Sequence, residues 1–249
     1  MLIVIDPGHG GNDPGAVANG LKEKDLNLDI AKRVKKYLGG YQVQVKMTRE
    51  DDRNLALNER AQLANAWGAG YYISLHINAG GGTGFESYAH QNANAAAIAR
   101  QKQIHDVVMK YYREHGFVDR GTKRANFAVL RETEMSAILL ENLFIDTVKD
   151  ANSLRNPTFR DGLAKSISDG LAAALGLVGT SPDQPGNLPN QPDPTPSQPG
   201  GGTTSPHWAA GAYLYLRQQG IVQDNHDLDS KVTWGELATA LQRVLEKNK

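Results

Sequence analysis

Four residues of the sequence have side chains that could hold a metal ion or move a proton: His9, Glu23, His76 and Glu141. His76 and Glu141 come directly after a short apolar run, His9 lies in the loop that follows another, and Glu23 follows soon after His9. Open α/β sheets place their ligand crevice where the strands end, so these side chains are expected to meet there. Two imidazoles and a carboxylate suit a catalytic zinc site, because they supply three ligands and leave the fourth tetrahedral position open for water.

Each of these residues also has an ordinary structural interpretation. A lone histidine at a strand end is typically a hydrogen-bonding loop residue, and Glu23 has the charge favoured in the first turn of a helix. Glu141 is harder to explain in this way, because the preceding Ala-Ile-Leu-Leu would carry it to the floor of the sheet, where an unpaired carboxylate is costly. Glycines around His9 also occur in phosphate loops, but neither Gly-x-Gly-x-x-Gly nor a Walker sequence is present. The spacing of these residues alone does not establish that they bind zinc.

Further polar residues could contact substrate or support the metal ligands. Asn78 would share a face with His76 if the strand continues, although a turn residue that closes the strand is an equal alternative. Arg49 could bind a substrate carboxylate, and Glu86 is expected at the rim of the crevice. Arg60 has acidic neighbours in sequence and is expected to form a structural ion pair.

Two other groups are interpreted as surface residues. One is a basic loop that could meet an anionic substrate or polymer, although a solvated loop is the simpler interpretation: Arg120, Lys123 and Arg124. The other is a set of histidines on a strand end or a helix face: His90, His105 and His115.

The elements that must position these side chains alternate along the chain. Short β-rich runs alternate with helical apolar spacing, which predicts an α/β domain with a largely parallel sheet. Strands are predicted at 2–6, 42–47, 71–76, 85–90, 127–130 and 137–141. Helical stripes are predicted at 26–38, 57–64, 104–111 and 159–175.

The composition excludes several classes of protein. The 249 residues include 27 basic and 27 acidic side chains, so no net charge draws the chain to nucleic acid or to an anionic membrane. The absence of cysteine excludes disulfide scaffolds, cysteine-ligated zinc and a thiol nucleophile. Only five apolar residues precede Asp6, and no run approaches the roughly 20 residues of a membrane helix, so we expect neither signal peptide nor anchor.

Proline divides the chain into two bodies. Eight of the 11 prolines lie in 178–206, which predicts a partly extended linker between a body at 1–177 and a small helical hairpin at 207–249.

Five separated motifs, in order, resemble the zinc-dependent N-acetylmuramoyl-L-alanine amidases of catalytic type 3. They are Asp-Pro-Gly-His-Gly-Gly at 6–11, Glu23, Thr-Arg-x-x-Asp at 48–52, Ser-Leu-His-Ile-Asn-Ala at 74–79 and Leu-Glu-Asn-x-Phe-Ile at 140–145. The resemblance covers about residues 1–176. Departures at Asn142, Leu143 and Ser136 leave the subfamily and the stem-peptide preference open.

The resemblance implies a twisted six-stranded sheet with helices on both faces, zinc (Zn2+) held by His9, Glu23 and His76, and Glu141 as the catalytic carboxylate. The implied reaction is hydrolysis of the amide between N-acetylmuramic acid and L-alanine in peptidoglycan, as in a phage endolysin or an autolysin. We expect synthesis in the bacterial cytoplasm and action on the cell wall after release through a holin-type pore or by cell lysis. The alternatives are another zinc peptidoglycan hydrolase, such as a stem-peptide peptidase or a deacetylase, and an inactive wall-binding protein.

The segment 207–249 is similar to a single surface-layer-homology repeat. Such repeats imply binding to a secondary cell-wall polymer. Because only one repeat is present where three normally pack together, self-association through the hairpin is the competing expectation.

Overall fold

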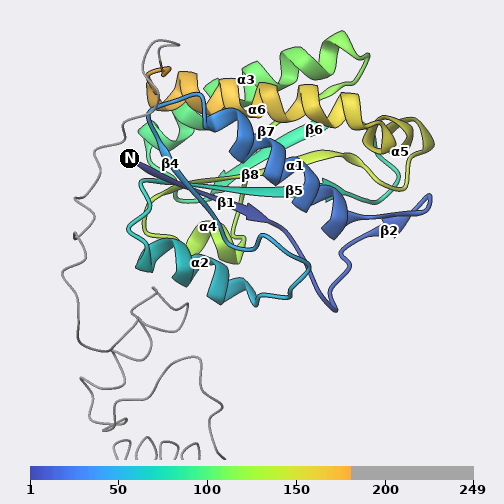
Figure 1. Cartoon of the computed structure of the whole chain (residues 1–249). Helices are drawn as coiled ribbons and strands as arrows, with labels where there is room; N and C mark the ends of the chain where they lie inside the picture. The colour runs from blue at the N-terminus through green and yellow to red at the C-terminus, as the bar shows by residue number, and fades with distance from the viewer. Residues whose placement is uncertain (181–249) are drawn as a thin grey trace, which may run out of the picture. The chain divides into compact units, whose positions relative to one another are not determined.

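The computed structural model of the chain describes residues 1–180 (Figure 1). The predicted helical body at 207–249 and most of the predicted linker lie outside the described residues. The first residues of that linker are part of the described fold: the backbone N–H of Gln42 donates to the carbonyl of Val178 at 2.8 Å, and that of Thr180 donates to the carbonyl of Gly40 at 2.9 Å. The described fold therefore extends to Thr180.

A six-stranded sheet forms the centre of this body. Its order is β4 (Gln44–Met47), β1 (Leu2–Pro7), β5 (Tyr71–Asn78), β8 (Ser136–Phe144), β6 (Phe85–His90) and β7 (Asp119–Ala125). Neighbouring strands are parallel except β6 and β8, which are antiparallel. The prediction of a mostly parallel six-stranded sheet is confirmed. A separate two-stranded ribbon pairs β2 (Val17–Ala18) with β3 (Leu21–Lys22).

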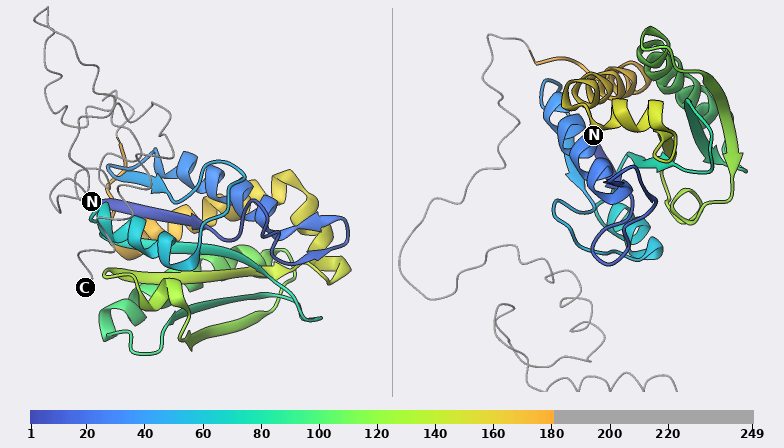
Figure 2. Two further views of the ribbon diagram at one scale, coloured as in Figure 1. Left: turned by 90° about the horizontal axis from the view of Figure 1, so that it is seen from below. Right: turned by 90° about the vertical axis from the view of Figure 1, so that its right-hand side faces the viewer.

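Helices cover the two faces of the sheet unequally. The long helices α1 (Glu23–Leu38), α3 (Ala95–Glu114) and α6 (Pro157–Leu175) lie on one face, and the short helices α2 (Leu57–Ala66) and α4 (Ala128–Arg131) lie on the other (Figure 1). Helix α5 (Val148–Arg155) lies near the carboxyl end of β8 (Figure 2). No helix of residues 1–180 is both long enough and apolar enough to cross a membrane.

The hydrophobic core consists of two clusters of unequal size, one on each face of the sheet. Alternate residues of the central strands, such as Ile5, Ile73 and Ile138, pack with the apolar stripes of α1, α3 and α6 in one large cluster. On the opposite face, a smaller cluster includes Tyr72 and Leu139 and lies under α2 and α4. That cluster ends before the last residues of β5 and β8, so polar side chains can occupy the rest of the face.

The sixth strand differs from the prediction. Residues 127–130 are not a strand: Val129 and Leu130 lie on helix α4, which buries them in the smaller cluster. The sixth strand is β7, whose sequence Asp-Arg-Gly-Thr-Lys-Arg-Ala is polar. An edge strand has one neighbour and faces solvent, so it does not need the apolar residues that identify a central strand.

One predicted surface residue is buried. His105 is 3% exposed, because it lies on the inner side of α3, where its ring stacks on Phe85. Its two ring nitrogens lie 2.9 Å from Ser87 Oγ and from Asp119 Oδ1. This histidine therefore joins α3 to the sheet.

Candidate active site

The strand register sets three polar side chains in a row across one face of the sheet. His76 on β5 is the direct partner of Glu141 on β8, and Glu141 is in turn the direct partner of Glu86 on β6. Because direct partners point to the same face, the three side chains neighbour one another at strand spacings of about 4.8 Å.

His9 is brought to this row by the loop that follows β1. The backbone of His9 has a φ of 62°, an uncommon conformation for a residue with a side chain. Hydrogen bonds on both sides hold it there: the N–H of Gly8 donates to the Leu75 carbonyl at 3.0 Å, and Arg60 Nη2 donates to the His9 carbonyl at 2.8 Å. Unusual backbone geometry of this kind is typical of functional sites.

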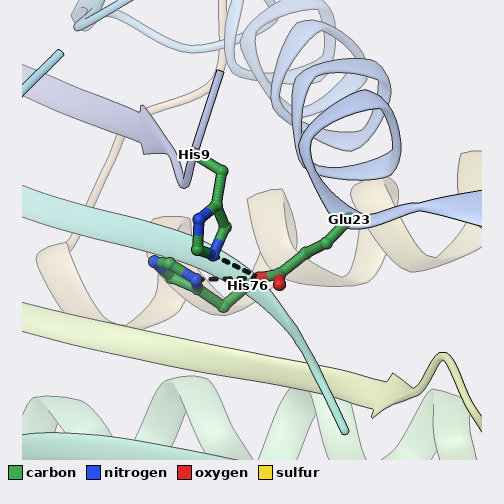
Figure 3. Close-up of side chains that lie close together, drawn as sticks. All are labelled: His9, Glu23 and His76. Carbon is green, nitrogen blue, oxygen red and sulfur yellow. Dashed lines mark hydrogen bonds and ion pairs between the residues drawn. The ribbon is translucent and has the colours of Figure 1, made fainter. Parts of the chain in front are cut away.

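Glu23, the first residue of α1, completes a cluster of possible metal ligands (Figure 3). Its Oε1 lies 2.9 Å from His76 Nδ1 and 3.2 Å from His9 Nε2. One ligand atom from each of the three residues lies within 4.8 Å of the others. Two imidazole nitrogens and one carboxylate oxygen are the donor set of a zinc site with an open position, so the residues present fit this metal.

Backbone and side-chain donors hold Glu23 in place. Its Oε2 accepts from the N–H of Ala16 at 2.9 Å, and its Oε1 accepts from the N–H of Ile77 at 3.1 Å and from Asn27 Nδ2 at 3.3 Å. These contacts fix the carboxylate before any ligand binds.

Asp13 supports His9 and was not identified from the sequence. His9 Nδ1 donates to Asp13 Oδ2 at 2.8 Å, which leaves Nε2 directed at Glu23. A carboxylate on the far nitrogen of a ligating histidine fixes the tautomer and the ring orientation. The available signal was an acid four residues after His9 within the same glycine-rich loop.

The pKa values in the cluster reflect its opposite charges. Burial acts to lower the pKa of His9, but the carboxylates of Glu23 and Asp13 outweigh it and raise the pKa to about 9. The pKa of His76 is also raised, because its contact with Glu23 outweighs burial. Burial acts to raise the pKa of Glu23, whereas hydrogen bonds with the two histidines hold it well below its usual range. The carboxylate is therefore ionised and available as a ligand.

Glu141 has the opposite electrostatic character. Its Oε2 is buried and has no hydrogen-bond partner among the described residues. Burial raises the pKa of Glu141 to about 7, and the nearby carboxylates of Glu23 and Glu86 act in the same direction. A carboxyl group that titrates near neutral pH can both accept and return a proton.

The structure assigns supporting contacts to the other predicted residues. Asn78 continues β5, and its Nδ2 donates to Glu86 Oε1 at 2.9 Å. Arg49 is fully buried and donates to the carbonyls of Pro7, Gly8 and Lys24, so it ties the His9 loop to the start of α1 and has no exposed surface for a substrate. The predicted acidic neighbours do not pair with Arg60, whose structural ion pair is formed with Asp6 at 2.9 Å.

An α/β sheet thus carries a cluster of possible metal ligands beside a buried carboxyl group with a raised pKa, an arrangement suited to a hydrolase. The chain belongs to the N-acetylmuramoyl-L-alanine amidase family, whose model matches residues 3–173.

Similar proteins each match about 70% of the chain. The sporulation-specific N-acetylmuramoyl-L-alanine amidase of Bacillus subtilis is 48% identical over 183 residues, which are 73% of this chain and 71% of that protein. The endolysin of Bacillus phage SPP1 is 44% identical over 180 residues, 71% of this chain and 66% of that protein. Among solved structures, an N-acetylmuramoyl-L-alanine amidase from Clostridium difficile has a TM-score of 0.67 and 35% identity, covering 70% of this chain and 96% of that chain.

Proposed function

We propose that this protein hydrolyses the amide between the lactyl group of N-acetylmuramic acid and L-alanine in peptidoglycan, with zinc held by His9, Glu23 and His76. The observation that carries the proposal is the convergence of these three side chains beside Glu141. The family membership supports the bond that is cut, and the donor set supports the metal.

The reaction divides between the metal and the protein. Zinc bound here would supply Lewis acidity to the scissile carbonyl and to the attacking water. Glu141 accepts a proton from that water and returns it to the nitrogen of L-alanine as the amide breaks. Within residues 1–180 the buried Oε2 of Glu141 has no hydrogen-bond partner, so no other donor competes for its lone pairs.

The remaining residues of the site act by position. Asp13 holds the His9 ring, and the N–H groups of Ala16 and Ile77 hold Glu23. Because these groups are already in place, little reorganisation is needed before the reaction, which is how enzymes reduce the barrier by orientation.

Mass spectrometry of digested, purified peptidoglycan tests this function. The wild-type protein should release stem peptides that begin at L-alanine and leave glycan with free lactyl groups. Chelation and Glu141→Ala should each abolish both products, while Glu141→Ala should still bind zinc. Cleavage within the stem peptide, or loss of acetyl groups alone, would replace the substrate assignment, and the absence of any product would favour a wall-binding protein.

We extend the proposal to the setting of the reaction. The protein would act on the bacterial cell wall after release from the cytoplasm, and 207–249 would bind a secondary cell-wall polymer. Because residues 178–180 hydrogen-bond to 40–42, the appropriate truncation removes 181–249. It should retain turnover of solubilised peptidoglycan and lose lysis of intact cells. A changed oligomeric state in light scattering would instead support self-association through 207–249.

A further inference from the structure

A cationic cluster continues the row of polar side chains beyond Glu141. Glu86 is 2% exposed, and its Oε2 accepts from Arg120 Nε at 2.7 Å and from Lys123 Nζ at 2.5 Å. Its Oε1 accepts from Asn78 Nδ2 at 2.9 Å and from the Tyr88 hydroxyl at 2.7 Å. One carboxylate is thus paired with two cations, and the cluster has one positive charge in excess.

A β-bulge places Arg120 in this cluster. Phe85 pairs with Asp119, and Ser87 pairs with Thr122, so Glu86 alone faces both Arg120 and Gly121. In regular alternation from Lys123, which pairs with Tyr88, the residue on the Glu86 side would be Gly121, which has no side chain. The bulge, with Gly121 at a φ of 83°, turns Arg120 to this face instead.

The guanidinium of Arg120 is held but not saturated. Its Cζ lies 4.8 Å from the centroid of the Phe144 ring, and its Nε is bound to Glu86. Within residues 1–180, neither of its terminal nitrogens has an acceptor. The side chains of Arg120 and Lys123 are 34% and 37% exposed, so the excess charge is accessible from solvent. Glu141 takes no hydrogen bond from either cation.

The two terminal nitrogens of a fixed guanidinium match a carboxylate, which they can bind in a bidentate manner with one N–H from each. We propose that Arg120, with Lys123 beside it, binds a free carboxylate of the stem peptide, on the residue that follows L-alanine. This inference rests on the proposed function. It makes Arg120 a determinant of specificity between stem peptides with free and with amidated carboxylates.

The distances agree with this assignment. Glu86 lies one strand from Glu141 and two strands from His76, which is about 5–10 Å across the sheet. An extended peptide covers that distance in about two to three residues. The charge also identifies the peptide side of the substrate, because a muramoyl sugar whose lactyl carboxylate is part of the scissile amide carries no charge.

Paired substrates test the proposal. They are soluble glycan fragments whose stem peptides differ only in having a carboxylate or a carboxamide on the residue after L-alanine. The zinc-loaded wild-type protein should cleave the carboxylate substrate with a kcat/KM about tenfold higher, a charge-assisted contact of about 1.4 kcal/mol, and the difference should lie in KM. Arg120→Gln should remove the preference by raising KM for the carboxylate substrate only, and Arg120→Lys should keep part of it.

Arg124→Gln is the matched control. Arg124 is the next residue of β7 after Lys123, it is exposed, and it pairs with Ala89, so its side chain points away from Glu86. Removing its charge should leave the preference unchanged.

The outcomes separate this inference from the proposed function. If the wild-type protein releases peptides that begin at L-alanine equally from both substrates, the function stands and the carboxylate site is overturned. A preference that persists in Arg120→Gln also overturns it. If neither substrate is cut at this bond, both proposals fail. Should Arg120→Gln not fold, the wild-type comparison and Arg120→Lys still decide.

Discussion

Gly8→Ala, which adds a single carbon, should weaken zinc binding. A Cβ at Gly8 would lie 2.3 Å from Cε1, 2.5 Å from Nε2 and 2.7 Å from Nδ1 of His76. Carbon atoms in contact lie about 3.5–4.0 Å apart, so the ring must move by about 1 Å. The backbone of Gly8 cannot easily move instead, because its N–H donates to Leu75 and its carbonyl accepts from Arg49.

The cost of Gly8→Ala should fall mainly on metal binding. Metal–ligand distances tolerate changes of about 0.2 Å, so a shift of about 1 Å should lower zinc affinity by about 100-fold or more. Overpacking alone should reduce the free energy of unfolding by about 1–3 kcal/mol. Competition with a chromophoric chelator measures the affinity, and thermal unfolding of the metal-free protein measures the stability.

Gly40→Ala provides the control for Gly8→Ala. Neither glycine has a positive φ, and a Cβ at Gly40 would meet only the Tyr37 carbonyl at 3.4 Å, an ordinary contact. This variant should bind zinc as the wild-type protein does. If Gly8→Ala folds and keeps wild-type zinc affinity and turnover, the observed position of His76 is not that of a ligand, and the reasoning is refuted.

Three further predictions concern stability. Asp6→Asn should lower the free energy of unfolding, measured with urea, by about 3–5 kcal/mol, because it leaves the buried Arg60 without its charged partner. Asp29 pairs with Arg33 of its own helix at 2.9 Å and joins α1 to α6 through Arg160 at 2.5 Å, and these contacts outweigh burial to lower its pKa. Because Asp29 is 35% exposed, Asp29→Asn should cost only about 1 kcal/mol at pH 7, measured by urea unfolding. Because the folded-state pKa is lowered, the difference should be complete above the unfolded value of about 3.9 and should decrease progressively as the pH falls toward the folded-state pKa; an unchanged difference at pH 3 would contradict it. Removing zinc should lower the melting temperature, since zinc at about 1,000 times its Kd adds about 4 kcal/mol, and an unchanged melting temperature would argue against a metal bound to the folded state.

The predicted ligand cluster could be identified from the sequence because its signals are local. Each of His9, His76 and Glu141 follows a buried apolar run, and parallel strands bring such positions to one end of a sheet. The position of Glu86 could not be obtained in this way. It depends on β8 lying between β5 and β6, a pairing between segments more than 50 residues apart in sequence. That pairing places Glu86 beside Glu141 and buries it under four donors rather than at an exposed rim.

Dependence on pairing between distant segments also explains why the sequence predicts a solvated loop for the basic residues at 120–124, whereas they belong to strand β7. Apolar content identifies strands that are buried on both faces, so the apolar residues of α4 resemble a strand and the polar residues of β7 do not. The contacts of Arg120 depend on a bulge opposite Glu86, and Glu86 lies 34 residues earlier in the chain. Its neighbours in sequence indicate only a cation near a glycine. In the sheet, its Nε binds the carboxylate of Glu86 and its two terminal nitrogens have no acceptor within residues 1–180, and these nitrogens are the donors for the proposed contact with substrate.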